Sequence, residues 1–466
     1  MRGVLRGLQG RVFNLGALCA DCMNAFHTGR LTQFGRDFGT TIAKKTRVLS
    51  FGDGSHGALG HTDCFGGDAY EPREINGLPE DVVSVGAGHY HSMAVAQTGE
   101  LWAWGRNLEG QLGERDGNTR EKWHQPQRVR GLESVEVVSA RGSGVVSMAI
   151  ARDGSLWTWG KSKRGQLGLG TKIMYAQTPK RVEALVGQQV VQVALGWGHA
   201  LARTAEGHVY SWGYAANGRL GFQLSDSESA ETSVKKTSPT AIARVDNESI
   251  EEAAYRQVLE DMEKEKSPVL AWEPVRINSL CSQHVTEISC GMDHSLTLNE
   301  KGELCSFGDN SLGQLGRSTA ISAVQSSIFA VENSEDHVQG LIRGEKVLHV
   351  GAGLGHSLAV TAQGSIYSWG WNAGHQLGRD ERQDSSLPAC VEDVEGDVVA
   401  LVGGRAHSLA LTSQGQLWVW GSGKNGRLGL GSPADEPSPL LLESLENHCI
   451  AEVACGFDHS LILLIS

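Results

Sequence analysis

One motif recurs along most of this chain, and its constant internal spacing limits the folds that the chain can adopt. The copy that begins at His407 reads HSLALTSQGQLWVWGSGKNGRLGLG. The other copies begin at His91, Val146, His199, His294 and His356. In every copy the glycine after the last aromatic residue stands 14 positions after the opening residue, and the LG glycine stands 8 positions further on. Repetition at a period of roughly 50 residues is typical of propellers and solenoids.

The repeated unit predicts four antiparallel strands. HSLALT and GxLWxWG read as the second and third strands, and Trp102 and Trp104 share one face of a strand because side chains alternate. Segments such as VEVVSA, upstream, and PQRVRGL, after the LG turn, read as the first and fourth strands. Glycines on both sides of the third strand permit the positive φ that tight connections require. We therefore expect an all-β protein.

The two ends of the repeated region are half units that complete each other. Residues 47–60, RVLSFGDGSHGALG, correspond to the second half of a unit, and residues 453–466, VACGFDHSLILLIS, to the first half. A ring whose last blade is built from both ends has no exposed sheet edge at its seam. The six internal units and this composite unit predict a seven-bladed β-propeller over residues 47–466.

These motifs resemble those of the regulator of chromosome condensation repeat family, whose members are seven-bladed propellers with the HSLALT, GxLWxWG and NxxGQLG signature. The resemblance extends from about Val48 to Ser466. A WD-type propeller fits less well, because its repeat is roughly 40 to 45 residues long and ends in a Trp-Asp pair that does not recur here. A fold of this kind hosts many activities, so function has to be argued from particular residues.

Residues 1–46 lie outside the repeats and differ from them in charge. Up to Arg47 the chain carries eight lysines or arginines and two acidic residues, a net charge of +6. Val4, Leu5, Leu8, Val12 and Leu15 fall on one side of a helical wheel. An arginine-rich, acid-poor amphipathic segment predicts a mitochondrial transit peptide. A chloroplast address and a plain disordered tail are the alternatives.

Subtracting that +6 from the −12 of the whole chain leaves −18 for residues 48–466, which are the propeller without Arg47. Nucleic-acid binding depends on lysine and arginine neutralising phosphates, so this charge argues against a broad RNA or DNA surface. The loop KSKRG, with Lys161, Lys163 and Arg164, is a candidate local contact with a phosphate or a partner. The alternative for such a charge run is a solvated loop.

One unit contains a long insertion at residues 222–267. Its first half is polar, and its second half predicts a helix, because Ser249 and Glu252 have capping-box spacing and apolar residues recur every four positions. Those residues, a candidate docking helix, are Ile250, Ala254, Val258 and Met262. The alternative is a surface insertion without function, since loops accept extra length at little cost.

The recurring histidines are predicted to be structural. They are His91, His199, His294, His356, His407 and His459. We expect them to hydrogen-bond backbone groups of the adjacent blade, and Val146 shows that one of them is dispensable. Metal binding would need converging ligands with supporting carboxylates. No nucleophile-base set, phosphate loop, metal motif or cofactor motif is recognisable, so we expect neither a catalytic residue nor a cofactor.

The family resemblance implies three activities that can be weighed. Photoreception by the ultraviolet-B receptors needs several tryptophans just before the histidine, and only Trp197 fits. The mitochondrial members imply a non-enzymatic scaffold for organelle RNA maturation, including intron splicing, and for biogenesis of respiratory complexes. The acidic propeller favours action through protein partners such as RNA-processing factors, with only indirect or local RNA contact. The alternative is guanine-nucleotide exchange on a small GTPase, whose loop residues the shared motif does not define.

Overall fold

The computed structural model describes residues 45–62, 66–113, 122–222, 269–317 and 344–466. The larger unit of the chain is residues 43–466. The predicted transit peptide and the predicted helix with Ile250, Ala254, Val258 and Met262 both lie outside the described residues. No helix in the described ranges is long and apolar enough to cross a bilayer.

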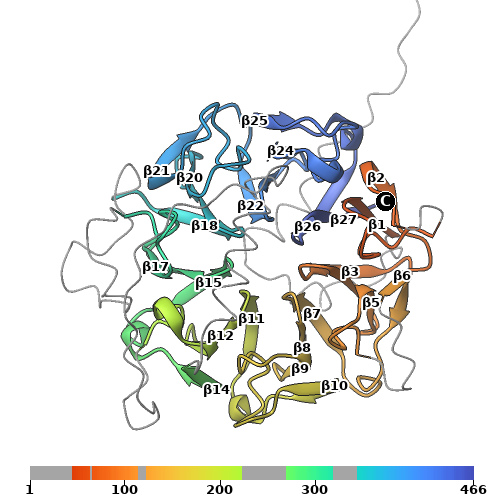
Figure 1. Ribbon diagram of the computed structural model, residues 1–466, viewed down its shortest axis with the longest axis vertical. Helices are drawn as coiled ribbons and strands as arrows, with labels where there is room; N and C mark the ends of the chain where they lie inside the picture. The colour runs from red at the N-terminus through yellow and green to blue at the C-terminus, as the bar shows by residue number, and fades with distance from the viewer. Residues whose placement is uncertain (1–44, 63–65, 114–121, 223–268, 318–343) are drawn as a thin grey trace, which may run out of the picture. The chain divides into compact units, whose positions relative to one another are not determined.

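The larger unit is a seven-bladed β-propeller, which confirms the predicted fold (Figure 1). We number the blades in chain order. Blades 1 to 3 contain β3(Val82–Ala87), β4(His91–Ala96), β5(Leu101–Arg106), β6(Lys122–Arg128); β7(Val137–Gly142), β8(Val146–Ala151), β9(Leu156–Lys161), β10(Tyr175–Arg181); and β11(Val190–Leu195), β12(His199–Thr204), β13(Val209–Tyr214), β14(Leu270–Arg276).

The remaining blades follow the same antiparallel order. Blades 4 to 6 contain β15(Val285–Cys290), β16(His294–Asn299), β17(Leu304–Gly308); β18(Val347–Ala352), β19(His356–Thr361), β20(Ile366–Gly370), β21(Ser385–Val391); and β22(Val398–Gly403), β23(His407–Thr412), β24(Leu417–Gly421), β25(Glu436–Leu441). Short 3-10 turns are η2(Glu183–Leu185), η3(Ala216–Gly218), η4(Asn278–Leu280), η5(Lys424–Gly426) and η6(Glu443–Leu445).

Blade 7 is built from both ends of the repeated region, as the half units predicted. Its strand order is β2-β1-β27-β26, with β1(Thr46–Gly52) and β2(Ala69–Glu74) from one end and β26(Cys449–Cys455) and β27(His459–Ile465) from the other. Strands β1 and β27 pair without a break from Thr46↔Ile465 to Gly52↔His459. The ring is therefore closed by seven consecutive residue pairs in the middle of a sheet.

Each blade has its first strand near the axis, and the six blades with four described strands have the fourth at the rim (Figure 1). In five blades the second strand is buried along its whole length, as in β4 and β23, because neighbouring blades cover both of its faces. The third strand carries the tryptophan that fills the space between blades. Trp104, Trp159, Trp212, Trp369 and Trp420 are all fully buried. Rings of this kind bury roughly 150 to 250 Å² of surface each.

The glycine after each of these aromatic residues has a steric reason. Gly105 has φ +108, and a Cβ added there would lie 2.6 Å from the carbonyl oxygen of Tyr90. Its position coincides with a register shift in the pairing of β5 with β6. The constant spacing in the sequence therefore marks a bulge at which the third strand passes the start of the second.

Candidate functional site

The seven loops between first and second strands meet around the axis of the ring. Each ends at the position of the recurring histidine, and the loop after each third strand lies on the same side, because the histidine pairs with the glycine that ends the third strand, as in His91↔Gly105. We call this side the axial loop face. The turns between second and third strands lie on the opposite face. Both candidate sites described below are on the axial loop face.

The recurring histidines join neighbouring blades at six of the seven seams. In each of these six seams, His Nε2 contacts the hydroxyl of a serine in the next blade, at 2.7 to 3.2 Å. The pairs are His91–Ser147, His199–Ser295, His294–Ser357, His356–Ser408, His407–Ser460 and His459–Ser92. The prediction that these histidines bond the adjacent blade agrees with the structure. The predicted partner was wrong, because it is a side-chain hydroxyl and not a backbone group.

The hydrogen bonds of the serine partners show which ring nitrogen of the histidine carries the proton. Ser147 Oγ donates to the carbonyl oxygen of Gln111, at 2.7 Å, and Trp159 Nε1 donates to the same oxygen, at 2.8 Å. The hydroxyl proton is thus in use, so His91 Nε2 carries a proton and donates to Ser147 Oγ. His91 Nδ1 is buried and has no hydrogen-bond partner among the residues that the structure describes. The ring is therefore neutral and serves as a donor between blades.

Burial lowers the pKa of every one of these histidines. The pKa of His91 and His356 falls to about 3, and the pKa of His294 and His459 to about 4. The pKa of His199 and His407 lies well below the ordinary value for the same reason. In each case loss of hydration disfavours the charged ring. Neutral, fully buried rings that each bond one serine fit a structural role.

The seam between blades 2 and 3 lacks this arrangement altogether. Val146 stands where the other blades have histidine, and Ala200 stands where the next blade would supply serine. Ser143 replaces a glycine, such as Gly88, whose Cβ would come within 2.2 Å of the His91 ring. The three changes belong together, because without the imidazole there is room for the Ser143 side chain and no use for a hydroxyl at 200.

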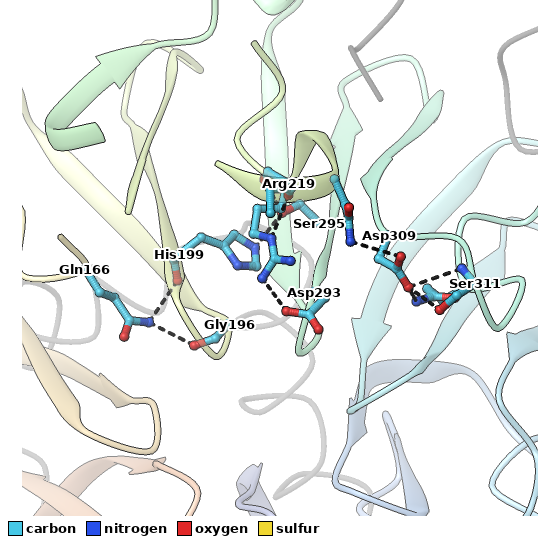
Figure 2. Close-up of polar contacts among 11 residues, drawn as sticks. Gln166, Gly196, His199, Arg219, Asp293, Ser295, Asp309 and Ser311 are labelled. Carbon is cyan, nitrogen blue, oxygen red and sulfur yellow. Dashed lines mark hydrogen bonds and ion pairs between the residues drawn. The ribbon is translucent and has the colours of Figure 1, made fainter. Parts of the chain in front are cut away.

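The axial loops show the same difference in their backbone. Hydrogen bonds link neighbouring loops at six seams, for example Trp197 N–H to Met292 O at 2.9 Å and Phe457 N–H to His89 O at 3.2 Å. Within the described residues, no backbone hydrogen bond joins the blade 2 loop to the blade 3 loop. Gln166 instead donates to the carbonyl oxygens of Gly196 and His199, at 2.8 and 2.9 Å (Figure 2).

Two seams carry a buried ion pair on the axial loop face. Arg219 follows β13 and contacts Asp293, which precedes the histidine of blade 4 (Figure 2). Arg427 is fully buried and reaches Asp458 of blade 7 at 3.1 Å. Arg405 also binds Asp458 through two atoms, at 2.8 and 3.1 Å. These pairs fix neighbouring blades to each other, and sequence reasoning missed them.

An aromatic cluster lies at the axis between the loops of blades 1, 3 and 7. His89 stacks on Trp197 with ring centroids 5.0 Å apart and planes inclined by 13°. The ring centroid of Phe457 lies 4.1 Å from that of His89 and 5.6 Å from that of Tyr90. Gly144 lies against the stacked pair, because a Cβ there would be 3.0 Å from His89 and 3.1 Å from Trp197. His89, Tyr90 and Trp197 are half-buried residues, and together they form one candidate contact surface.

The KSKRG loop is the second candidate surface, and the structure separates its three cations. Arg164 lies over the ring of Tyr214 at 4.5 Å, and Arg219 lies over the same ring at 4.7 Å. Lys161 and Lys163 are exposed. Arg164 is thus held against blade 3, while the two lysines are accessible to a partner. No group of three or more histidine, cysteine or acidic side chains in the described ranges could hold a metal ion.

The regulator of chromosome condensation (RCC1) repeat model matches residues 46–95, 98–150, 153–203, 363–411 and 414–463. A second model of the same description matches residues 82–111, 190–219, 347–376 and 398–427. The crystal structure of Prp20p from Saccharomyces cerevisiae, described with its binding properties to Gsp1p and histones, superposes with a TM-score of 0.70 at 22% identity. It covers 91% of this chain and 92% of that chain.

Three curated relatives are similar over most of this chain. Ultraviolet-B receptor UVR8 of Arabidopsis thaliana is 28% identical, covering 83% of this chain and 76% of the relative. RCC1 domain-containing protein RUG3, mitochondrial, of Arabidopsis thaliana is 27% identical, covering 78% of this chain and 88% of the relative. The secretion-regulating guanine nucleotide exchange factor of Mus musculus is 31% identical, covering 70% of this chain, which spans 63% of that relative.

Proposed function

Because the chain belongs to the regulator of chromosome condensation repeat family, we propose that it is a non-enzymatic mitochondrial scaffold that supports RNA maturation, including intron splicing, and respiratory complex biogenesis. It acts through protein partners that dock on the exposed loops of the propeller. The similarity to the mitochondrial RUG3, over 78% of this chain and 88% of that relative, is the observation that carries the proposal.

The charge of one part of the surface favours basic partners. The connections on either side of blade 6, on the face opposite the axial loops, expose six carboxylates: Glu392, Asp393, Glu395, Asp397, Glu443 and Glu446. A field of one sign attracts a partner of the other sign and raises its rate of association. Proteins that process RNA carry basic surfaces. An acidic surface attracts such proteins and repels the phosphates of bare RNA, so it favours a protein partner over RNA.

Loss of the chain followed by rescue tests the scaffold. We expect cells without it to accumulate unspliced mitochondrial transcripts and to lose assembled respiratory complexes, and the full chain to restore both. Neutralising all six carboxylates to glutamine or asparagine should weaken the rescue. The matched control is Glu183→Gln with Glu206→Gln, on the same face near blades 2 and 3. Normal splicing and normal respiratory complexes without the chain would refute the proposal.

Affinity purification from mitochondria, with and without ribonuclease, identifies the partners. RNA-processing proteins that remain bound after ribonuclease treatment support docking through protein surfaces. Partners that are lost with the RNA would show that RNA bridges them, which contradicts the proposed mode of action.

Guanine-nucleotide exchange on a small GTPase is the second candidate, favoured by the similarity to the secretion-regulating exchange factor. An exchange factor binds the nucleotide-free GTPase in preference to the loaded form, so added nucleotide lowers its affinity. Recovery of a small GTPase that GTP releases from the purified chain, together with faster nucleotide release in its presence, would support exchange. A GTPase that stays bound when GTP is added would exclude it.

Mitochondrial localisation has its own test. Residues 1–46 fused to a fluorescent protein should direct it to mitochondria, because the segment is basic and poor in acidic residues. A chloroplast or cytosolic signal would contradict the mitochondrial part of the proposal without touching the scaffold role.

A further inference from the structure

Four large apolar side chains are exposed together where blades 1 and 2 meet at the rim. Leu108 is 56% exposed, Ile173 43%, Met174 44% and Tyr175 50%. Ile173 to Tyr175 are consecutive, and the Tyr175 ring lies over Gly110, two residues from Leu108. With Lys161, Lys163 and Lys172 they form what we call the basic apolar patch. Grouped apolar exposure of this kind marks interaction sites on soluble proteins.

The backbone under this patch is fixed by hydrogen bonds. Ser162 N–H donates to Met174 O at 2.9 Å, and Tyr175 pairs with Lys161 at the start of β10. Gly170 N–H donates to Trp272 O of blade 3, at 3.2 Å, just before the exposed segment begins. The apolar side chains are therefore presented on a loop anchored at both ends. A fixed surface loses less conformational freedom when a partner binds.

Three lysines belong to the same loop and strand ends: Lys161 pairs with Tyr175, Lys163 follows two residues later, and Lys172 directly precedes Ile173. Lys161, Lys163 and Lys172 are exposed, and no ion pair joins them to another residue in the described ranges. The nearby Glu109 already binds Arg106, at 2.8 Å, and Gln111, at 3.2 Å. Glu273 is the acidic side chain beside Gly170. A local excess of positive charge in a chain of net charge −12 is complementary to an acidic ligand.

We propose that the basic apolar patch is a docking surface for an acidic protein segment that carries large apolar side chains. The aliphatic side chains contact the apolar residues of the segment, and the lysines pair with its carboxylates. Tyr175 is the one aromatic ring among the four exposed apolar side chains, so successive bases would find no series of rings to stack on, which favours a protein over single-stranded RNA. This surface is distinct in position and charge from the acidic connections around blade 6, and the inference does not depend on the proposed function.

Photo-crosslinking from the patch tests this inference. A photoreactive phenylalanine analogue replaces Tyr175 in the full chain expressed in its own cells, and mass spectrometry maps the crosslinked segment. We expect an acidic segment with large apolar residues. A second photoreactive chain carries the analogue at Leu440, a rim position of blade 6 with 42% exposure. Capture of the same segment from Leu440, crosslinks to RNA, a basic segment, or no crosslink would each overturn the proposal.

Two sets of substitutions show which side chains are responsible. Lys161→Glu, Lys163→Glu and Lys172→Glu together should reduce the crosslink at least tenfold, and so should Ile173→Ser with Met174→Ser. The matched control is Lys180→Glu with Arg181→Glu at the far end of β10, which should leave the crosslink unchanged. Unfolding midpoints are compared for all chains. An equal loss of crosslink in the control, or no loss in either patch variant, would contradict the docking surface.

Discussion

At the scale of single residues, the buried histidines make the stability of the fold sensitive to acid. Each has a pKa lowered by burial, and His356 titrates at about 3 in the fold against roughly 6.5 in the unfolded chain. Between those values the unfolded chain binds more protons, so the free energy of unfolding falls as pH falls. The stability that the neutral ring contributes is complete above pH 6.5 and declines continuously towards pH 3.

His356→Gln tests this linkage, because an amide can still donate to Ser408 and does not titrate. Urea unfolding between pH 7 and pH 4 should show a shallower decline in the variant than in the original chain, by up to about 1.4 kcal/mol per pH unit. The control is His448→Gln, since His448 is exposed. Equal slopes for His356→Gln and the original chain would refute the linkage.

Asp458 binds two arginines, and its removal should be costly. Arg427 is fully buried, and the Asp458 side chain is 11% exposed, so Asp458→Asn leaves a buried guanidinium without its carboxylate. We expect a loss of about 3 kcal/mol in the free energy of unfolding by urea.

The comparison for Asp458 is Glu136→Gln, which breaks an ion pair with Arg152 whose side chains are 62% and 54% exposed. That loss should stay below about 1 kcal/mol, because solvent screens exposed pairs. Equal losses in the two variants would show that burial of the Asp458 pairs does not contribute to their strength.

The sequence contained a signal for these ion pairs that sequence reasoning missed. Arg219 and Arg427 stand in the two copies that read NGRLG, and Asp293 and Asp458 stand in the two copies that read DHS, each in the following blade. The blade order brings each arginine to its aspartate. The axial aromatic cluster had no such signal, because His89, Trp197 and Phe457 occupy one repeat position in blades that are not all neighbours, and only the closed ring brings them together.

At the scale of elements, the strands could be predicted almost completely, because each copy repeats the same burial pattern. The exception is the seam between blades 2 and 3. Val146 was recognised as a replacement for histidine, but Ser143 and Ala200 were not connected with it. Their connection is visible only when the first strand of one blade and the second strand of the next are seen side by side.

Restoring the common arrangement at this seam tests whether the three positions act as a set. Val146→His alone should lower the free energy of unfolding by about 2 to 3 kcal/mol, since it buries an imidazole without a partner against the Ser143 side chain. Adding Ser143→Gly and Ala200→Ser should recover at least about 1 kcal/mol.

Urea unfolding of the single, double and triple variants measures this coupling. Recovery by Ser143→Gly alone would show that room for the ring matters and the hydroxyl does not. A triple variant no more stable than Val146→His alone would contradict the idea of a set.

At the scale of the whole molecule, the closure of blade 7 places the two ends of the repeated region side by side. Ser466 N–H donates to Lys45 O at 2.8 Å, and Thr46 pairs with Ile465. An Asn-Gly link from Ser466 to Lys45 would turn β27 and β1 into a hairpin. We expect a chain permuted in this way, opened between Gly187 and Gln188, to unfold in urea within about 1 kcal/mol of the original.

Truncation after Asp458 is the contrasting experiment, because it removes the strand between β26 and β1. That chain should lose its cooperative unfolding transition and aggregate. A truncated chain that still unfolds cooperatively, or a permuted chain that does not fold, would show that the β1–β27 pairing does not hold the ring closed.

Because β1 pairs with β27, β1 stays without this partner strand from its own synthesis until β27 is made. A ribosome completes β1 first and β27 last, with about 400 residues between them, and at roughly 5 to 20 residues per second that interval lasts on the order of 20 to 80 seconds. Throughout it, Val48 and Phe51 have no β27 beside them. Until the final strand emerges, the side of β1 that pairs with β27 is therefore an unpaired sheet edge in every newly made chain.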